Sequence, residues 1–162
     1  MLFRSSLARS LYGGETTPDT AITMITLAEA RLFQGDPASA EPILRQAFDI
    51  LNKKLPLRYP PVMTAEVRLG EALTAEGKAA EAEPLLREAL GSAYTPPFRI
   101  PAWQVGEAES ALGWCLAVLG RPQEAIKFLR ASQQKLLNDP RPMFRKQATV
   151  HLQALLQVHE RP

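Results

Sequence analysis

A catalytic site needs a nucleophile with a base within reach, and the chain offers one such combination. Cys115 is the single cysteine, and His151 lies downstream of it, so the two could form a thiolate–imidazole pair. Cys115 follows Gly113 and Trp114 in an apolar stretch, however, and a free cysteine usually behaves as a small buried hydrophobe. We therefore interpret Cys115 as a packing residue and predict no catalytic residue and no enzymatic activity.

Metal and paired-carboxylate chemistry have equally weak support. His151 and His159 lie eight residues apart, without a third ligand at helical spacing, so we predict no metal site. Glu29 and Glu71 recur 42 residues apart and could suggest a carboxylate pair. Stacked repeat units would hold such equivalents about 10 Å apart, too far to share a proton. There is no glycine-rich phosphate loop beside a strand, so we expect no cofactor.

Composition narrows the functional classes further. Of the 162 residues 22% are charged, and the formal net charge is +2, which gives no electrostatic footprint for nucleic acid. A single cysteine excludes an internal disulfide framework. No signal peptide and no apolar run of about 20 residues is found. We therefore expect a cytoplasmic protein that binds neither nucleic acid nor membrane.

A three-residue phrase occurs four times along the chain, at intervals of 41, 42 and 43 residues. Its copies are Leu2-Phe3-Arg4, Ile43-Leu44-Arg45, Leu85-Leu86-Arg87 and Phe128-Leu129-Arg130. Such a near-constant period indicates a solenoid, whose units bury their apolar faces by stacking on their neighbours. Because the first copy begins at residue 2, we expect it to be an orphan helix, half of a unit.

Each complete unit is predicted to be an antiparallel pair of helices. Gly35, Gly77 and Gly120 stand eight residues before the phrase, where glycine can end the first helix in the left-handed conformation. Small residues on both sides should let the two backbones approach, while the leucines of the phrase fill the groove beside them. These small residues are Ala28, Gly70, Gly113, Ala40, Ala82 and Ala125. The apolar spacing of three and four favours helices over strands.

The sequence thus predicts one all-α domain over residues 1–162, with three full repeats between an orphan N-terminal helix and a C-terminal capping helix. Proline-rich links separate the units, so the prolines are expected at helix boundaries. The predicted helices are 2–11 (orphan), 19–34 and 38–53 (repeat 19–53), 61–76 and 79–91 (repeat 61–91), 102–119 and 122–137 (repeat 102–137), and 142–158 (cap).

These units resemble the tetratricopeptide repeat. The second unit matches it almost position for position, at Leu69-Gly70, Leu73, Gly77, Ala82, Leu86 and Ala89. The third unit has Ser132 in place of the final alanine, and the first has Arg31 where leucine or tyrosine is usual. Units of about 42 residues look like the kinesin light chain variant, which is common in bacterial multidomain signalling proteins. The resemblance implies a right-handed superhelical solenoid that binds proteins.

By the same resemblance, the first helix of each pair lines a concave groove. The residues implied to contact a partner there are Ile25, Glu29, Phe33, Arg68, Glu71, Ser110 and Trp114. Two plainer interpretations stay open. Trp114 could pack against the next helix, and Arg68 with Glu71 could form a weak surface pair three residues apart.

Members of this family that bind chaperone tails use lysine and asparagine side chains to clamp a peptide carboxylate. At the lysine position this sequence has Ile25, Val67 and Ser110, and at the asparagine position it has two glutamates and a tryptophan. We therefore reject that ligand. The mixture of acidic and aromatic side chains would suit a peptide or helix of basic and apolar character.

We predict a protein–protein interaction module or scaffold, part of a larger bacterial signalling or regulatory protein. The alternative is a self-associating structural or oligomerisation fragment. An RNA-binding helical repeat is less favoured, because no basic groove is evident. Leu2, Phe3, Leu7 and Leu11 form an apolar stripe whose neighbouring helix is missing, and we predict homo-oligomerisation through it.

Overall fold

A computed structural model describes residues 17–56, 59–93, 100–137, 141, 149–150 and 152–153. The main helices are α2 (Pro18–Phe33), α3 (Pro37–Lys54), α4 (Pro60–Ala75), α5 (Ala79–Ala93), α6 (Ala102–Val118) and α7 (Pro122–Leu136). Their ends agree with the expected helices to within two residues. The predicted orphan helix 2–11 lies outside the described residues. So does most of the predicted cap, although 149–150 and 152–153 are helical and Leu152 is buried.

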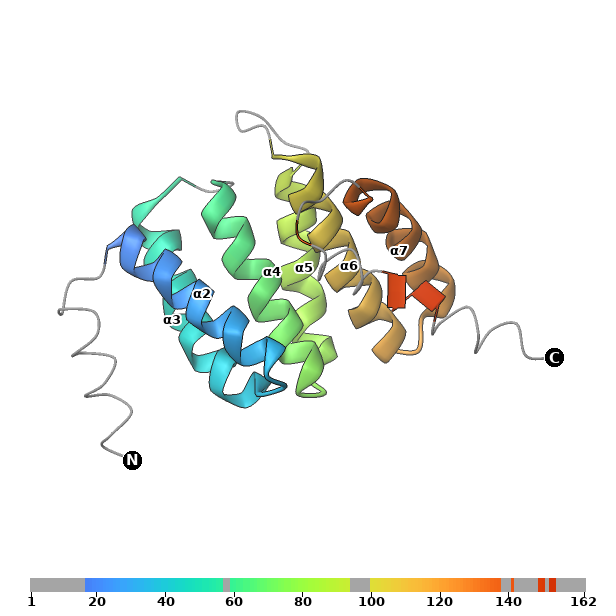
Figure 1. Ribbon diagram of the computed structural model, residues 1–162, viewed down its shortest axis with the longest axis horizontal. Coiled ribbons are helices and arrows are strands. Elements are labelled where there is room, and N and C mark those ends of the chain that lie inside the picture. The colour runs from blue at the N-terminus through green and yellow to red at the C-terminus, as the bar shows by residue number, and fades with distance from the viewer. Residues whose placement is uncertain are drawn as a thin grey trace.

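The helices pack as three successive pairs, α2 with α3, α4 with α5 and α6 with α7 (Figure 1). Neighbouring first helices also approach closely, since Cα atoms of α4 lie within 8 Å of both α2 and α6. Among the described elements no such approach joins α3 to α5 or α5 to α7. The closer spacing of the first helices curves the array, so α2, α4 and α6 form its inner side. The all-α solenoid expected from the repeat is confirmed.

The turn inside each pair has the same geometry three times. Gly35, Gly77 and Gly120 have φ of 74°, 80° and 73°, the left-handed region that glycine enters without steric penalty. The amide after each glycine donates back to a carbonyl five residues earlier, as in Asp36 N to Arg31 O at 2.9 Å. This bond ends the first helix and turns the chain into the second.

The helices of a pair cross where the sequence places small residues. A Cβ atom added to Gly70 would lie 2.5 Å from the Leu86 side chain, and one added to Gly113 would lie 2.6 Å from Leu129. Ala82 and Ala125 are fully buried at the same crossings. The predicted backbone approach, with leucines of the phrase filling the groove, is therefore confirmed in α4–α5 and α6–α7.

The three positions of the repeated phrase have three different roles. Leu44, Leu86 and Leu129, the middle residues, are completely buried. The first residues are partly buried against the core. In the first two complete units the arginine reaches across to the next repeat, where Arg45 donates to Glu81 at 2.5 Å and Arg87 to Glu124 at 2.6 Å. The phrase therefore encodes both packing within a unit and an ion pair between units.

Two prolines differ from the expectation that prolines mark boundaries. Pro42 lies inside α3 and Pro84 inside α5, at equivalent repeat positions, and both are exposed. Each lies in the second turn of its helix, where one backbone hydrogen bond is lost while the helix continues. Pro18, Pro37, Pro60 and Pro122 do begin helices, as proline near the first turn should.

Candidate functional site

Arg68 is the centre of an ion-pair network on the inner side of the array. Its side chain is 2% exposed, and each guanidinium nitrogen donates to a different carboxylate. Nε donates to Glu29 at 2.6 Å, Nη1 to Glu71 at 3.1 Å and Nη2 to Glu107 at 2.8 Å. Glu29 is on α2, Glu71 is on α4 beside Arg68, and Glu107 is on α6. One cation therefore holds three consecutive first helices together.

A second arginine completes the network. Arg141, which follows α7, donates from Nη2 to the other oxygen of Glu107 at 2.5 Å. Its guanidinium carbon also lies 4.3 Å from the centre of the Trp103 ring, a cation–π contact. Among the described residues the network thus contains three carboxylates and two guanidinium groups, with a formal charge of −1.

Burial and the charges of the network act in opposite directions on the pKa values of its members. Burial alone would lower the pKa of Arg68, but the carboxylates of Glu71, Glu107 and Glu29 raise it above its ordinary value. Burial raises the pKa of Glu71 and of Glu107, and Arg68 offsets this effect only in part. The charged forms of Glu71 and Glu107 are therefore less favourable here than in water, and a further cation nearby would stabilise them.

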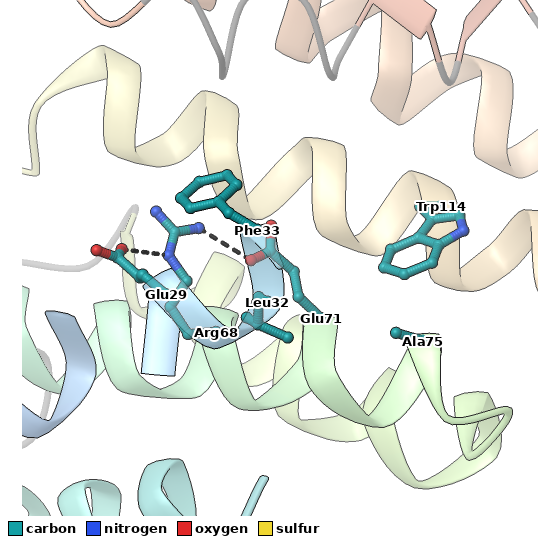
Figure 2. A pocket seen from close by; sticks show the side chains of 7 residues that line it. All are labelled: Glu29, Leu32, Phe33, Arg68, Glu71, Ala75 and Trp114. Atoms are coloured by element: carbon teal, nitrogen blue, oxygen red, sulfur yellow. Dashed lines mark hydrogen bonds and ion pairs between the residues drawn. The ribbon is translucent and has the colours of Figure 1, made fainter. Parts of the chain in front are cut away.

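A pocket of about 240 Å³ opens over the network. Its lining comes from all three first helices and consists of Glu29, Leu32, Phe33, Arg68, Glu71, Ala75 and Trp114. Figure 2 shows the Arg68 guanidinium between the carboxylates of Glu29 and Glu71, with Trp114 at the opposite end of the pocket on α6. Phe33, the last residue of α2, is 50% exposed. The pocket therefore combines acidic groups with aromatic surface.

Five of the seven residues implied to contact a partner line this pocket, namely Glu29, Phe33, Arg68, Glu71 and Trp114. Ile25 and Ser110 do not line it, because both are buried at 5% and 7% exposure. Trp114 is only partly buried, so it is neither a fully packed core residue nor a fully exposed one. The pocket therefore brings together five of the seven residues that the family resemblance implied, and Ile25 and Ser110 are not part of its lining.

The interpretation of Arg68 and Glu71 as a weak surface pair is wrong. Arg68 is buried, and its two other carboxylate partners come from neighbouring repeats. Sequence spacing could reveal only Glu71, since Glu29 and Glu107 each lie 39 residues away from Arg68. Arg141 was also missed, because it lies in a proline-rich link that sequence patterns treat as a simple connection.

Cys115 has the surroundings of a packing residue. It is fully buried, its thiol donates to the Ala79 carbonyl at 3.2 Å, and burial raises the pKa of the thiol. Its hypothetical partner His151 is among the residues whose side chains the structure does not describe. Within the described ranges, no group of three or more His, Cys, Asp or Glu side chains could hold a metal ion.

Two further expectations concern self-association and membrane crossing. Leu2, Phe3, Leu7 and Leu11, predicted to mediate self-association, all lie outside the described residues. In the part of the chain that is described, no helix has the length and apolar character needed to cross a bilayer.

Comparison with known proteins agrees with this architecture. Residues 21–46 and 64–88 match the tetratricopeptide repeat family. These segments correspond to α2 with the start of α3 and to most of α4 and α5. No curated protein sequence matches the chain.

Solved structures give a similar picture. The tetratricopeptide-like repeats of a putative kinesin light chain from Podosopora anserina superpose with a TM-score of 0.70 at 21% identity, covering 88% of this chain and 68% of that one. A variant of the same protein gives 0.68 at 20% identity, with the same coverage. The tetratricopeptide domain of Arabidopsis FLU gives 0.56 at 22% identity, covering 74% of this chain and 96% of that one. Two segments of the chain thus match the tetratricopeptide repeat, and the described helices form an all-α solenoid of the tetratricopeptide-like kind.

Proposed function

We propose that the chain is a protein-interaction module that binds a segment of a partner protein along the inner side of α2, α4 and α6. The observation that carries this proposal is the pocket over Arg68, where three helices of different repeats contribute to one concave surface. Tetratricopeptide repeat domains generally bind protein partners, which supports the same class of function.

The chemistry of the pocket favours a peptide over a nucleic acid. Phosphate groups need cationic partners, and the described ion-pair network on the inner side has more carboxylates than guanidinium groups. Arg68 is unavailable to an anion, because it is buried and surrounded by carboxylates. Phe33 supplies exposed aromatic surface, the side-chain type enriched at protein–protein interfaces.

Selection from a displayed peptide library tests the proposal. Peptides enriched on the wild-type chain should bind Phe33→Ala at least tenfold more weakly, because the aromatic wall of the pocket is lost. Val118→Ala is a matched control, since Val118 is also 50% exposed and is the last residue of its first helix, α6, but does not line the pocket. If no peptide is enriched, or if both variants bind equally well, the proposed function is wrong.

Self-association through Leu2, Phe3, Leu7 and Leu11 stays a prediction, because the structure does not describe these residues. Sedimentation velocity at micromolar concentration would test it, and a clean monomer would contradict it. The place of the chain in a larger bacterial signalling or regulatory protein is likewise a prediction, as is its cytoplasmic location.

A further inference from the structure

The pocket over Arg68 has the size of a receptor for one side chain. Pockets that enclose drug-sized molecules measure about 300–1,000 Å³. At about 240 Å³ this pocket is smaller, and its mouth lies on the inner side of the array, where a partner segment would lie. If the proposed function holds, the pocket would take a single anchoring residue of the partner.

Two carboxylates in the pocket each have an oxygen that can still accept a hydrogen bond. Glu29 accepts a hydrogen bond from Arg68 only at Oε1, and Glu71 accepts one only at Oε2. The second oxygen of each carboxylate has no hydrogen-bond partner among the described residues. Both side chains keep contact with solvent, at 25% and 12% exposure. An incoming donor would therefore meet two carboxylate oxygens already held in position by the buried guanidinium.

The negative charge of the network favours a hydrogen-bond donor that is itself a cation. Among the described residues three carboxylates share two guanidinium groups, which is a deficit of one positive charge. Burial raises the pKa of Glu71, and Arg68 offsets that effect only in part. A cation placed in the pocket would reduce this deficit, whereas an anion would increase it. Phe33 and Trp114 line the same pocket with aromatic surface, and aromatic faces attract cations, guanidinium more often than ammonium.

We propose that the pocket between α2, α4 and α6 binds an arginine side chain of the partner, whose guanidinium donates to the unoccupied oxygens of Glu29 and Glu71. This inference rests on the proposed function, since it names the residue that anchors the partner segment. A planar guanidinium suits the site because it can donate to two carboxylates and stack on an aromatic ring at the same time.

A titration with small probes tests the proposal on the wild-type chain. The probes are N-acetyl-arginine amide and its neutral isostere N-acetyl-citrulline amide, and the readout is the indole N–H signal of Trp114 in an NMR spectrum. The second tryptophan, Trp103, does not line the pocket and serves as an internal reference. We expect saturable movement of the Trp114 signal with arginine and at least about tenfold weaker binding of citrulline, because bonds between charged groups exceed neutral ones by that margin.

Variants then locate the effect. Glu29→Gln and Glu71→Gln should each weaken binding of the arginine probe several-fold, because the anionic acceptor becomes neutral. Glu83→Gln makes the same change on the outer side of the array, where Glu83 pairs with Arg87 and Arg121, and should leave binding unchanged. Thermal unfolding of each variant shows whether it is folded. If a glutamine variant does not fold, the comparison of the two probes on the wild type still decides.

Several results would overturn the inference. These are equal binding of arginine and citrulline, equal or tighter binding of a third probe, N-acetyl-lysine amide, and movement of the Trp103 signal alone. Failure here is distinguishable from failure of the proposed function. If selected peptides need Phe33 but bind equally well after arginine is replaced by citrulline, the groove function stands and the arginine site is wrong. If no peptide is selected at all, the proposed function itself fails.

Discussion

The second and third repeats have the same packing residues but differ in the identity or the partners of their buried polar side chains. At the packing positions they are nearly identical, with Gly70 against Leu86 in one and Gly113 against Leu129 in the other. In the second repeat, Glu66 is 5% exposed and has no hydrogen-bond or ion-pair partner among the described residues. Its equivalent in the third repeat, Glu109, receives two hydrogen bonds from Lys135, at 2.7 and 2.9 Å.

Two other buried polar side chains occur in only one of the two repeats. Arg68 in the second repeat corresponds to Ala111 in the third, and Ser132 in the third corresponds to Ala89 in the second. Packing positions recur because every unit must stack on the next in the same manner. The buried polar groups are less regular, because Glu66 recurs as Glu109 with a different set of partners, whereas Arg68 and Ser132 have alanine at the equivalent position of the other repeat.

The largest expected effect is at Arg68. Arg68→Met would leave the carboxylates of Glu29, Glu71 and Glu107 without their shared cation, and we expect a loss of about 3–5 kcal/mol in the free energy of unfolding at pH 7. Chemical denaturation measures this value. The loss should shrink toward pH 4, because burial raises the pKa of Glu71 and of Glu107 and both side chains gain protons as the pH falls. A loss below about 1 kcal/mol, typical of exposed pairs, would mean that the network does not stabilise the fold.

The next effect concerns Glu66 and depends on pH. Burial, followed by the charge of Glu88, raises the pKa of Glu66 from 4.5 to about 8. The native state therefore binds a proton that the unfolded chain releases, and this contribution to stability is complete below pH 4.5 and is lost as the pH rises through 8. The loss is on the order of a few kcal/mol, since one pKa unit corresponds to about 1.4 kcal/mol.

Denaturation curves at several pH values test this expectation as the difference between the wild type and Glu66→Gln, which removes the titrating group. Ser92 occupies in α5 the position that Lys135 has in α7, so Ser92→Lys should supply the missing partner and reduce the decline. Parallel pH profiles for the wild type and Glu66→Gln would show that Glu66 titrates normally.

A smaller effect of opposite sign is expected at Ser132. Its side chain is fully buried, and its hydroxyl oxygen has no hydrogen-bond partner in the described part of the chain. Ser132→Ala restores the residue found at the equivalent Ala89 and should stabilise the chain by about 1 kcal/mol, because an unsatisfied buried polar group is removed. An increase in melting temperature checks this. A decrease would indicate that the hydroxyl has a role that packing does not explain.

The smallest effect is expected at the exposed arginines that link the first repeat to the second and the second to the third. Arg45 and Arg87 form equivalent ion pairs on the outer side, and both side chains are about 40% exposed or more. Arg45→Met should change the free energy of unfolding by no more than about 1 kcal/mol. It is also the control for Arg68→Met, being the same substitution at an exposed arginine. Equal losses for the two variants would contradict the contrast between buried and exposed networks.

Sequence patterns were sufficient for the fold but not for the site. The glycine turns, the crossings at small residues and the helix ends follow from local preferences and a repeated spacing, and all can be read along the chain. Five pocket residues were named through the family resemblance, yet Ile25 and Ser110 from the same set proved to be buried. Exposure at these positions depends on how closely α2, α4 and α6 approach one another, and no local pattern encodes that distance.

The sequence alone determined the helix pairs and their order, because capping, periodicity and small-residue spacing act within one unit or between adjacent units. The tertiary structure decided the charge network. Arg68 meets Glu29 and Glu107 only because stacking brings residues 39 positions apart to within hydrogen-bond distance. Burial then turns these contacts into a strong constraint, since a charge removed from water must find its partners inside the protein.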